Sequence, residues 1–111
     1  MVFQNNLMMA AASISAAADV TLASSAESGN TPGTSFTFAD QALGDAAADR
    51  KLVVITGAGS SAASVSAMTI AGVSAAEVVC IGTAESNSEM WQADVPTGTS
   101  GDVVITYSIS I

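Results

Sequence analysis

The sequence predicts an all-β protein, an immunoglobulin-like antiparallel β-sandwich preceded by an N-terminal arm. Between residues 36 and 107 the chain consists of short apolar runs, each ended by Gly, Ser, Asn or Pro. β-Branched runs interrupted in this way are typical of antiparallel sandwiches and small barrels. About six or seven such runs in about 75 residues match the strand spacing of a sandwich. The 111 residues leave room for one domain with a modest core.

Residues 1–33 are predicted to form an anchoring arm and linker, and residues 34–111 to form the sandwich. The arm begins with Met-, Ala- and Ser-rich sequence and ends in TLASSAESGNTPGTS, which has the composition of a linker. Residues 4–18 have some helical character and favour a short helix, although a helix this short needs a surface to pack on.

The strands of the domain follow in order along the chain. Phe36 and Phe38 are separated by one residue, so both rings should lie on one face of the opening strand. Residues 51–56, KLVVIT, form a near-continuous apolar run that fits a central strand. The next run, 65–70, is predicted to alternate, with Val65 on one face and Met68 and Ile70 on the other.

The remaining strands are separated by turn-forming residues. A return strand should end near Ile81, a further strand should surround Trp91, and the last should carry Val103, Ile105 and Tyr107 on one face. Turns are predicted at Ala71-Gly72, Asn87-Ser88 and Pro96-Thr97-Gly98. The side chains expected to anchor the core are Phe36, Phe38, Val54, Ile70, Trp91, Ile105 and Tyr107.

The charge of the chain excludes several classes of partner. Ten acidic and two basic residues give a formal net charge of −8. Nucleic acids and anionic membranes would be repelled, since binding to them depends on Lys and Arg. Charged residues make up only 11% of the chain, so the surface should be mostly Ser, Thr, Ala and Gly. Such a surface is expected where other subunits cover it, as in a homo-oligomer.

One segment resembles the start of a dinucleotide-binding domain. In LVVITGAGSSAAS an apolar strand runs into Gly57 and Gly59. Pyrophosphate binding also needs a third glycine and a helix whose N-terminus faces the phosphates. Ala62 and Ala63 stand where that glycine would fall, and the following SVSAMTIAGV fits a strand better than a helix. We therefore interpret the segment as a strand that ends in a flexible hairpin.

The residue inventory argues against catalysis, and we expect neither enzymatic activity nor a cofactor. The chain has no His, which excludes a Ser-His-Asp triad and a His metal site. Cys80 is the sole cysteine and is expected to be a small buried hydrophobe in the run AEVVCI. Ca²⁺ binding at one pole stays open, although turn capping fits the carboxylates better; these are Asp45, Asp49, Asp94 and Asp102.

Two further side chains stand out. Arg50, the only arginine, is expected to form an ion pair with Asp45, Asp49 or Asp102. A contact to a partner subunit is the alternative, because Arg is favoured in desolvated interfaces. Trp91 is interpreted as a core residue between the sheets rather than a platform for a sugar ring.

Three groups of residues place turns and strands in a recognisable pattern. They are Leu43, Gly44, Asp49 and Arg50; Thr69, Ile70, Gly72, Val73 and Ala75; and Val95, Pro96, Gly98, Gly101 and Tyr107. Together with the aromatic opening strand, this pattern resembles a β-sandwich module of tailed-bacteriophage virion structural proteins, of the head decoration, cement or tail accessory type. The resemblance covers about two-thirds of the chain and implies a virion component without giving its place on the particle.

From the resemblance and the arm we predict a non-enzymatic virion structural protein, a capsid decoration or cement protein on the capsid exterior. Its partners would be the major capsid protein, copies of itself, or both. The residues predicted to make this contact are Val2, Phe3, Leu7, Met8, Met9 and Arg50.

Two alternatives remain. The chain could be a tail or fibre accessory protein that binds a host-surface glycan, for which an exposed Trp91 would be the expected platform. It could also be a secreted bacterial surface or filament subunit, although no Lys or Arg precedes Arg50 to supply the positive start of a signal peptide.

Overall fold

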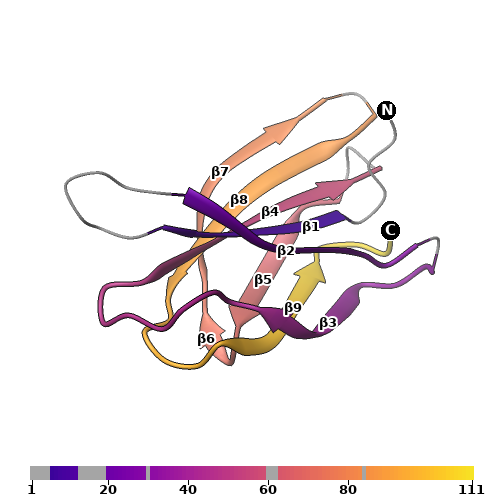
Figure 1. Cartoon of the computed structure of the whole chain (residues 1–111). Coiled ribbons are helices and arrows are strands. Elements are labelled where there is room, and N and C mark those ends of the chain that lie inside the picture. Colours follow the sequence, from indigo (N-terminus) through magenta and orange to yellow (C-terminus); the bar gives the residue numbers. More distant parts are fainter. Residues whose placement is uncertain (1–5, 13–19, 30, 60–62, 84) are drawn as a thin grey trace.

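The computed structural model describes the chain except for residues 1–5, 13–19, 30, 60–62 and 84. The predicted all-β class is confirmed, because the described residues form two antiparallel sheets packed face to face as a β-sandwich (Figure 1). The immunoglobulin-like topology stays a prediction. The strands are β1 Asn6–Ala12, β2 Val20–Glu27, β3 Ser35–Ala42, β4 Lys51–Ala58, β5 Val65–Ile70, β6 Val73–Ser74, β7 Ala76–Gly82, β8 Asn87–Asp94 and β9 Ser100–Tyr107.

The two sheets have different sizes. One has five strands in the order β2-β1-β4-β8-β7, and the other has four in the order β3-β9-β5-β6. At one side of the sandwich β2 and β3 are linked, since Ser24 Oγ donates to Gln41 Oε1 across 3.1 Å. At the other side the four-stranded sheet ends in β6, which has two residues, while β7 has seven. Only Ala75 separates these two strands in the chain.

The N-terminal segment belongs to the five-stranded sheet, which differs from the predicted arm. β1 pairs with β4 along its whole length, from Asn6 opposite Gly57 to Ala12 opposite Lys51, and β2 covers the other edge of β1. The helix expected within residues 4–18 is therefore wrong for the described part, which is extended. The Ala-rich sequence favours a helix locally. However, β4 offers β1 a row of backbone hydrogen-bond partners that an isolated short helix lacks. Consequently the boundary at residue 33 does not separate an arm from the sandwich.

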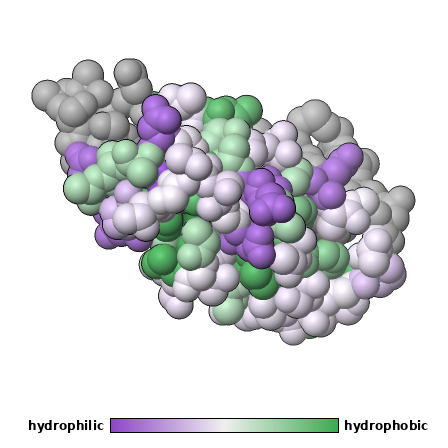
Figure 2. All heavy atoms as spheres, turned by 60° about the horizontal axis from the view of Figure 1, so that its bottom comes forward, coloured by the Kyte–Doolittle hydropathy of each residue, from purple (hydrophilic) through white to green (hydrophobic). Residues whose placement is uncertain are grey.

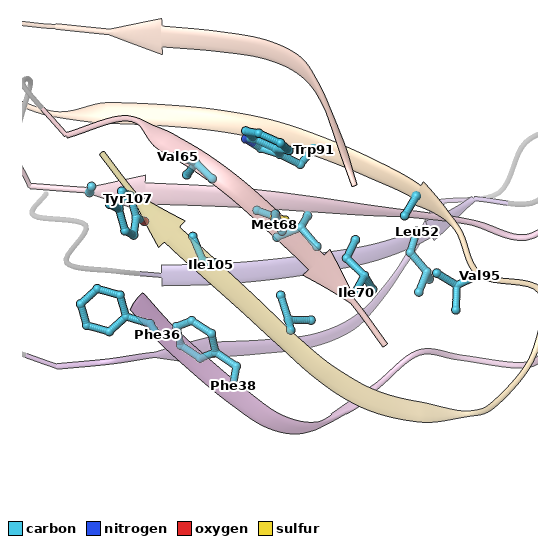
Figure 3. Close-up of a cluster of buried hydrophobic side chains, with 14 of the residues drawn as sticks. Phe36, Phe38, Leu52, Val65, Met68, Ile70, Trp91, Val95, Ile105 and Tyr107 are labelled. Atoms are coloured by element: carbon cyan, nitrogen blue, oxygen red, sulfur yellow. The ribbon is translucent and has the colours of Figure 1, made fainter. Parts of the chain in front are cut away.

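The core lies between the sheets. All seven predicted anchors are buried: Phe36, Phe38, Val54, Ile70, Trp91, Ile105 and Tyr107. Leu43, Leu52 and Val103 are also fully enclosed. Figure 3 shows the rings of Phe36, Phe38 and Tyr107 near one end, apart from the indole of Trp91, and Phe36 meets Tyr107 edge to face at 6.0 Å between centroids. That geometry is the preferred one for aromatic pairs.

The alternation of β3 and β9 follows the prediction. Phe36 and Phe38 face the core from β3, and Val103, Ile105 and Tyr107 face it from β9. The predicted turn at Ala71-Gly72 also forms, with φ of 51° and 78° at the two residues. Two consecutive positive φ values are typical of the tight turns that join antiparallel strands.

Three local predictions are wrong. β4 is not followed by a hairpin, because β5 pairs with β9 in the other sheet and the chain crosses between the sheets. Asn87 opens β8 rather than forming a turn; the turn lies earlier, where Thr83 N–H donates to the Ser86 carbonyl. In β5 the ladder shifts register between Val65 and Ala67, so Val65 and Met68 both face the core.

None of the described residues lies in a helix that could span a bilayer.

Candidate interaction surface

Arg50 lies inside the molecule, so the predicted partner contact and ion pair are both wrong. The residue is 3% exposed, and its guanidinium donates only to backbone carbonyls. The acceptors are Val95 at 2.7 Å, Thr97 at 2.9 Å, Gly44 at 3.0 Å and Leu43 at 3.4 Å. In the described part of the chain no carboxylate lies within ion-pair distance of Arg50. The planar guanidinium suits this role because its donors are held in a fixed fork.

We call the set of hydrogen bonds from the Arg50 guanidinium to these four carbonyls the Arg50 clamp. The clamp connects two parts of the sequence pattern, the connector and the last turn. Arg50 ties the Leu43-Gly44 backbone to the segment that contains Val95 and Thr97, and the Val95 N–H returns a bond to the Arg50 carbonyl at 3.3 Å. The pattern residues in this region therefore build the scaffold.

Glycine at position 101 is required by a close approach of two segments. A Cβ there would lie 2.6 Å from the Ala71 Cβ, 3.1 Å from the Ala71 Cα and 3.5 Å from Leu43 Cδ1. The first of these distances is far below van der Waals contact, so the β5–β6 turn packs directly on β9. Gly101 is thus another pattern residue with a packing role.

A buried carboxylate lies at the start of β8. Glu89 is 3% exposed and accepts the Val65 N–H at 2.6 Å, while the Asn87 amide donates to the Ala63 carbonyl at 2.6 Å. Burial raises the pKa of Glu89, repulsion from Glu77 adds to the rise, and the Val65 N–H opposes it. Among the described residues the Trp91 Nε1–H has no hydrogen-bond partner of standard geometry, yet it lies close enough to Glu89 to lower this pKa somewhat. This carboxylate joins β5 to β8, that is, one sheet to the other.

Cys80 is exposed, which contradicts its predicted burial. It lies on β7, the edge strand of the five-stranded sheet, all seven residues of which are exposed. Partial desolvation, then repulsion from Glu89 and Glu77, raises the pKa of the thiol. The neutral thiol is therefore favoured, and thiolate chemistry is disfavoured.

Glu77, Cys80 and Glu89 bring potential metal-ligand atoms within 4.8 Å of one another. The set mixes a thiol with carboxylates, the donors that Zn²⁺ accepts. However, Glu89 already accepts a hydrogen bond from the backbone, and the Cys80 Sγ donates to Asn87 Oδ1 at 3.3 Å. The arrangement is accounted for by contacts within the protein.

The carboxylates considered for Ca²⁺ have other partners or lie apart. Asp94 pairs with Lys51 at 2.6 Å on the surface, and Asp102 accepts the Asp40 N–H at 3.0 Å. The latter bond supports Asp40, whose φ is 52°, at the irregular step in β3. Asp45 and Asp49 are exposed in the connector. In the described residues the structure gathers no calcium site from these four.

The outer face of the five-stranded sheet is apolar across several strands. In the register, Val79 of β7 stands beside Met90 of β8, Met90 beside Ile55 of β4, and Ile55 beside Met8 of β1. Ile55 is 37% exposed and Val79 42%. This apolar row crosses the sheet from the β7 edge toward β2, where Leu22 is 58% exposed.

Most of the exposed large apolar side chains belong to this sheet. Val20, Leu22, Ile55, Val78, Val79 and Ile81 lie on its strands, whereas Val73 and Ile109 do not. Exposed apolar residues grouped on one face mark interaction surfaces more often than scattered ones do. Figure 2 brings forward the side of the molecule that lies at the bottom of Figure 1, near β3, β9 and β6, and much of that side is pale, that is, neither strongly hydrophilic nor strongly hydrophobic. This agrees with the weakly charged surface expected from the composition.

The apolar residues predicted for the arm have mixed positions. Val2 and Phe3 lie outside the described residues. Leu7, Met8 and Met9 fall within β1, between β2 and β4, so their backbone is part of the sheet. Sequence reasoning missed the sheet face because the outward residues of β4 and β8 occur one by one between buried ones, while β7 is exposed along its whole length. The pairing register that aligns them is a property of the fold.

Trp91 is buried, as expected of a core residue, with 7% of its surface exposed. Figure 3 shows its indole between the strands of the sandwich. It therefore offers no open aromatic platform for a sugar ring.

No family model, no curated protein and no solved structure matches this chain.

Proposed function

We propose that this chain is a non-enzymatic structural subunit of a tailed-bacteriophage virion, a capsid decoration or cement protein on the outer shell. The observation that carries the proposal is the apolar outer face of the five-stranded sheet, centred on Ile55 and Val79. In isolation such a face costs free energy by exposing apolar surface to water, and a covering partner removes that cost.

The contact is assigned to the sheet face rather than to a free arm. A standard interface buries about 800 Å² on each partner, which a five-stranded sheet face can supply. A large proportion of apolar area is typical of lasting subunit contacts. The backbone of β1 lies inside the sheet, where Met8 pairs with Ile55, so the described part of the predicted arm belongs to the sheet that carries this surface.

The charge of the chain fits such a role. With a net charge of −8, copies repel one another in solution, which keeps free subunits from aggregating through their apolar faces. The resemblance of the connector, the β5–β6 turn and the closing segment to virion modules supports the same class. No observation favours the glycan-binding alternative, since its aromatic platform is buried.

Counting copies in purified particles tests the proposal. Quantitative mass spectrometry of virions from the phage that encodes the chain should find it at hundreds of copies, as expected of a subunit that follows the symmetry of the shell. Roughly three to twelve copies would place it on the tail or a fibre and contradict the decoration role. Absence from the particle would overturn the virion assignment altogether.

A further inference from the structure

β7 is an uncovered edge strand. All seven of its residues, Ala76–Gly82, are exposed, and among the described residues β8 is its only neighbour in the sheet (Figure 1). An edge strand presents a row of backbone N–H and C=O groups that can pair with another strand. We call the free side of Ala76–Gly82 the β7 edge.

The other described edges are protected. β2 is tied to β3 by the Ser24–Gln41 hydrogen bond. β3 is interrupted by a register shift between Phe38 and Gln41 and carries Asp40 at its bend. β6 has only two residues. β7 has one irregular step, between Glu77 and Val79, but its second half is regular. Edges that are not blocked by bulges, charges or short length are available for pairing.

The chemistry of the β7 edge is unusual for this chain. Residues 78–83, VVCIGT, carry no charge in a protein with ten acidic residues. Val78 is 50% exposed and Ile81 62% exposed. Repeated exposure of β-branched side chains on an unpaired strand is the pattern that favours strand addition.

We propose that the β7 edge pairs antiparallel with the β7 edge of a second copy, joining two five-stranded sheets into one. Pairing about a two-fold axis at Cys80 would place Val79 opposite Ile81 of the other copy, twice by symmetry. Directly opposed residues lie on the same face of a sheet. In β7, Val79 and Ile81 stand beside the outward residues Met90 and Ser88. The dimer would therefore extend the apolar row across the junction.

The net charge repels two copies of the chain from each other over most of their surface. The uncharged β7 edge is therefore the place where a second copy binds most readily. Two chains of charge −8 can approach closely only where the contact is uncharged. In the pairing about Cys80, the two Glu77 residues are separated by six strand positions, about 20 Å, which exceeds the Debye length of about 8 Å at physiological salt. One strand pair buries less than a standard interface, so the dimer should be weak and concentration-dependent. The inference does not depend on the proposed function, since such a dimer could form in a chain of any role.

Sedimentation velocity over a concentration series tests the pairing. The wild-type chain should shift from its monomer mass of 10.9 kDa toward twice that value as concentration rises. Ile81→Lys should abolish the shift, because a charge would enter the strand pair. The matched control is Val20→Lys on the opposite edge, since Val20 is 67% exposed and Ile81 62%. This control should dimerise like the wild type.

A crosslinking measurement tests the register independently of any charge substitution. Opposed Cα atoms in an antiparallel pair lie about 4.5–5.5 Å apart, within the range of about 4.4–6.8 Å that a disulfide spans. Diamide, which takes up the two electrons and two protons released by two thiols, should crosslink the wild type through Cys80, and Cys80→Ser should not crosslink. A wild type that stays monomeric at millimolar concentration would overturn the proposal. So would a dimer lost in Val20→Lys and kept in Ile81→Lys.

Discussion

Arg50 acts as a structural cross-link made of hydrogen bonds. Four backbone carbonyls converge on one buried guanidinium, two from the connector at Leu43 and Gly44 and two from the closing segment at Val95 and Thr97. Buried carbonyls without donors cost free energy, so this one side chain satisfies groups that would otherwise weaken both loops.

Replacing Arg50 by Lys should therefore destabilise the fold. An ammonium keeps the charge but cannot reach four carbonyls arranged for a planar fork, so we expect a loss of about 1–3 kcal/mol in the free energy of unfolding. Urea denaturation measures this loss. Lys51→Met is the control; its ion pair with Asp94 is exposed and should contribute less than about 1 kcal/mol. Equal losses in the two variants would contradict the clamp.

Tyr107 reports on the interior of the sandwich. It is the only tyrosine, and burial, followed by repulsion from Glu89, raises its pKa to about 12, against a weaker opposing hydrogen bond with Thr56. A raised pKa in the folded state means that the stability from Tyr107 is complete below about pH 10 and is lost as pH rises toward 12.

Tyrosinate absorbance should accordingly titrate near pH 12 in the folded protein and near 10 in denaturant. Glu89→Gln removes the second cause of the shift while its side-chain oxygen can still accept the Val65 N–H. The titration of this variant should move below that of the wild type. A folded wild-type protein whose tyrosine titrates near 10 would contradict the packing described for Tyr107.

At the scale of elements, the contact between the β5–β6 turn and β9 depends on one missing side chain. Gly101→Ala places a methyl group 2.6 Å from the Ala71 Cβ and should cost about 1–3 kcal/mol of stability. Ala71→Gly removes that opposing carbon and suits the φ of 51°. The double variant should therefore be more stable than Gly101→Ala alone. Additive effects in denaturation experiments would show that the two positions are not in contact.

A deletion of β1 distinguishes most sharply between a free N-terminal arm and an integral strand of the sheet. Deleting residues 1–12 removes the strand between β2 and β4, so the cooperative unfolding transition should be lost. Deleting residues 1–5 leaves β1 intact and serves as the control, which should keep that transition. Thermal unfolding followed by circular dichroism makes the comparison. If the chain without residues 1–12 unfolded like the control, β1 would be a detachable arm.

Strands in which apolar and polar residues alternate can be predicted from the sequence, and strands without that alternation cannot. β3 alternates over residues 35–38 and β9 over residues 102–107, so the inward side chains such as Phe38 and Ile105 could be identified. β1 could not, because Ala and Met carry a helical preference that only the pairing with β4 overrides. Arg50 stands out in the sequence as the sole arginine, but its partners are backbone carbonyls, which every residue has, and no pattern of side chains reveals them.

For the whole molecule, the asymmetry of the sandwich matters most. Five strands face four, so the larger sheet extends past the smaller one at β7 and leaves that edge uncovered. The same sheet carries most of the exposed large apolar side chains. A face and an edge on one sheet could serve two contacts, one to a larger partner and one to a second copy.

In the role that we propose, the outer face of the five-stranded sheet holds the subunit on its particle. Its most direct test is to measure how many copies of two lysine variants are incorporated into phage particles, relative to the wild type. Ile55→Lys places a charge in the middle of this face, and Thr37→Lys places the same charge at an exposed position of β3 in the other sheet. With both variants shown to be folded, we predict that Ile55→Lys is lost from particles and Thr37→Lys is retained. Full incorporation of Ile55→Lys would show that this face does not hold the subunit on its particle.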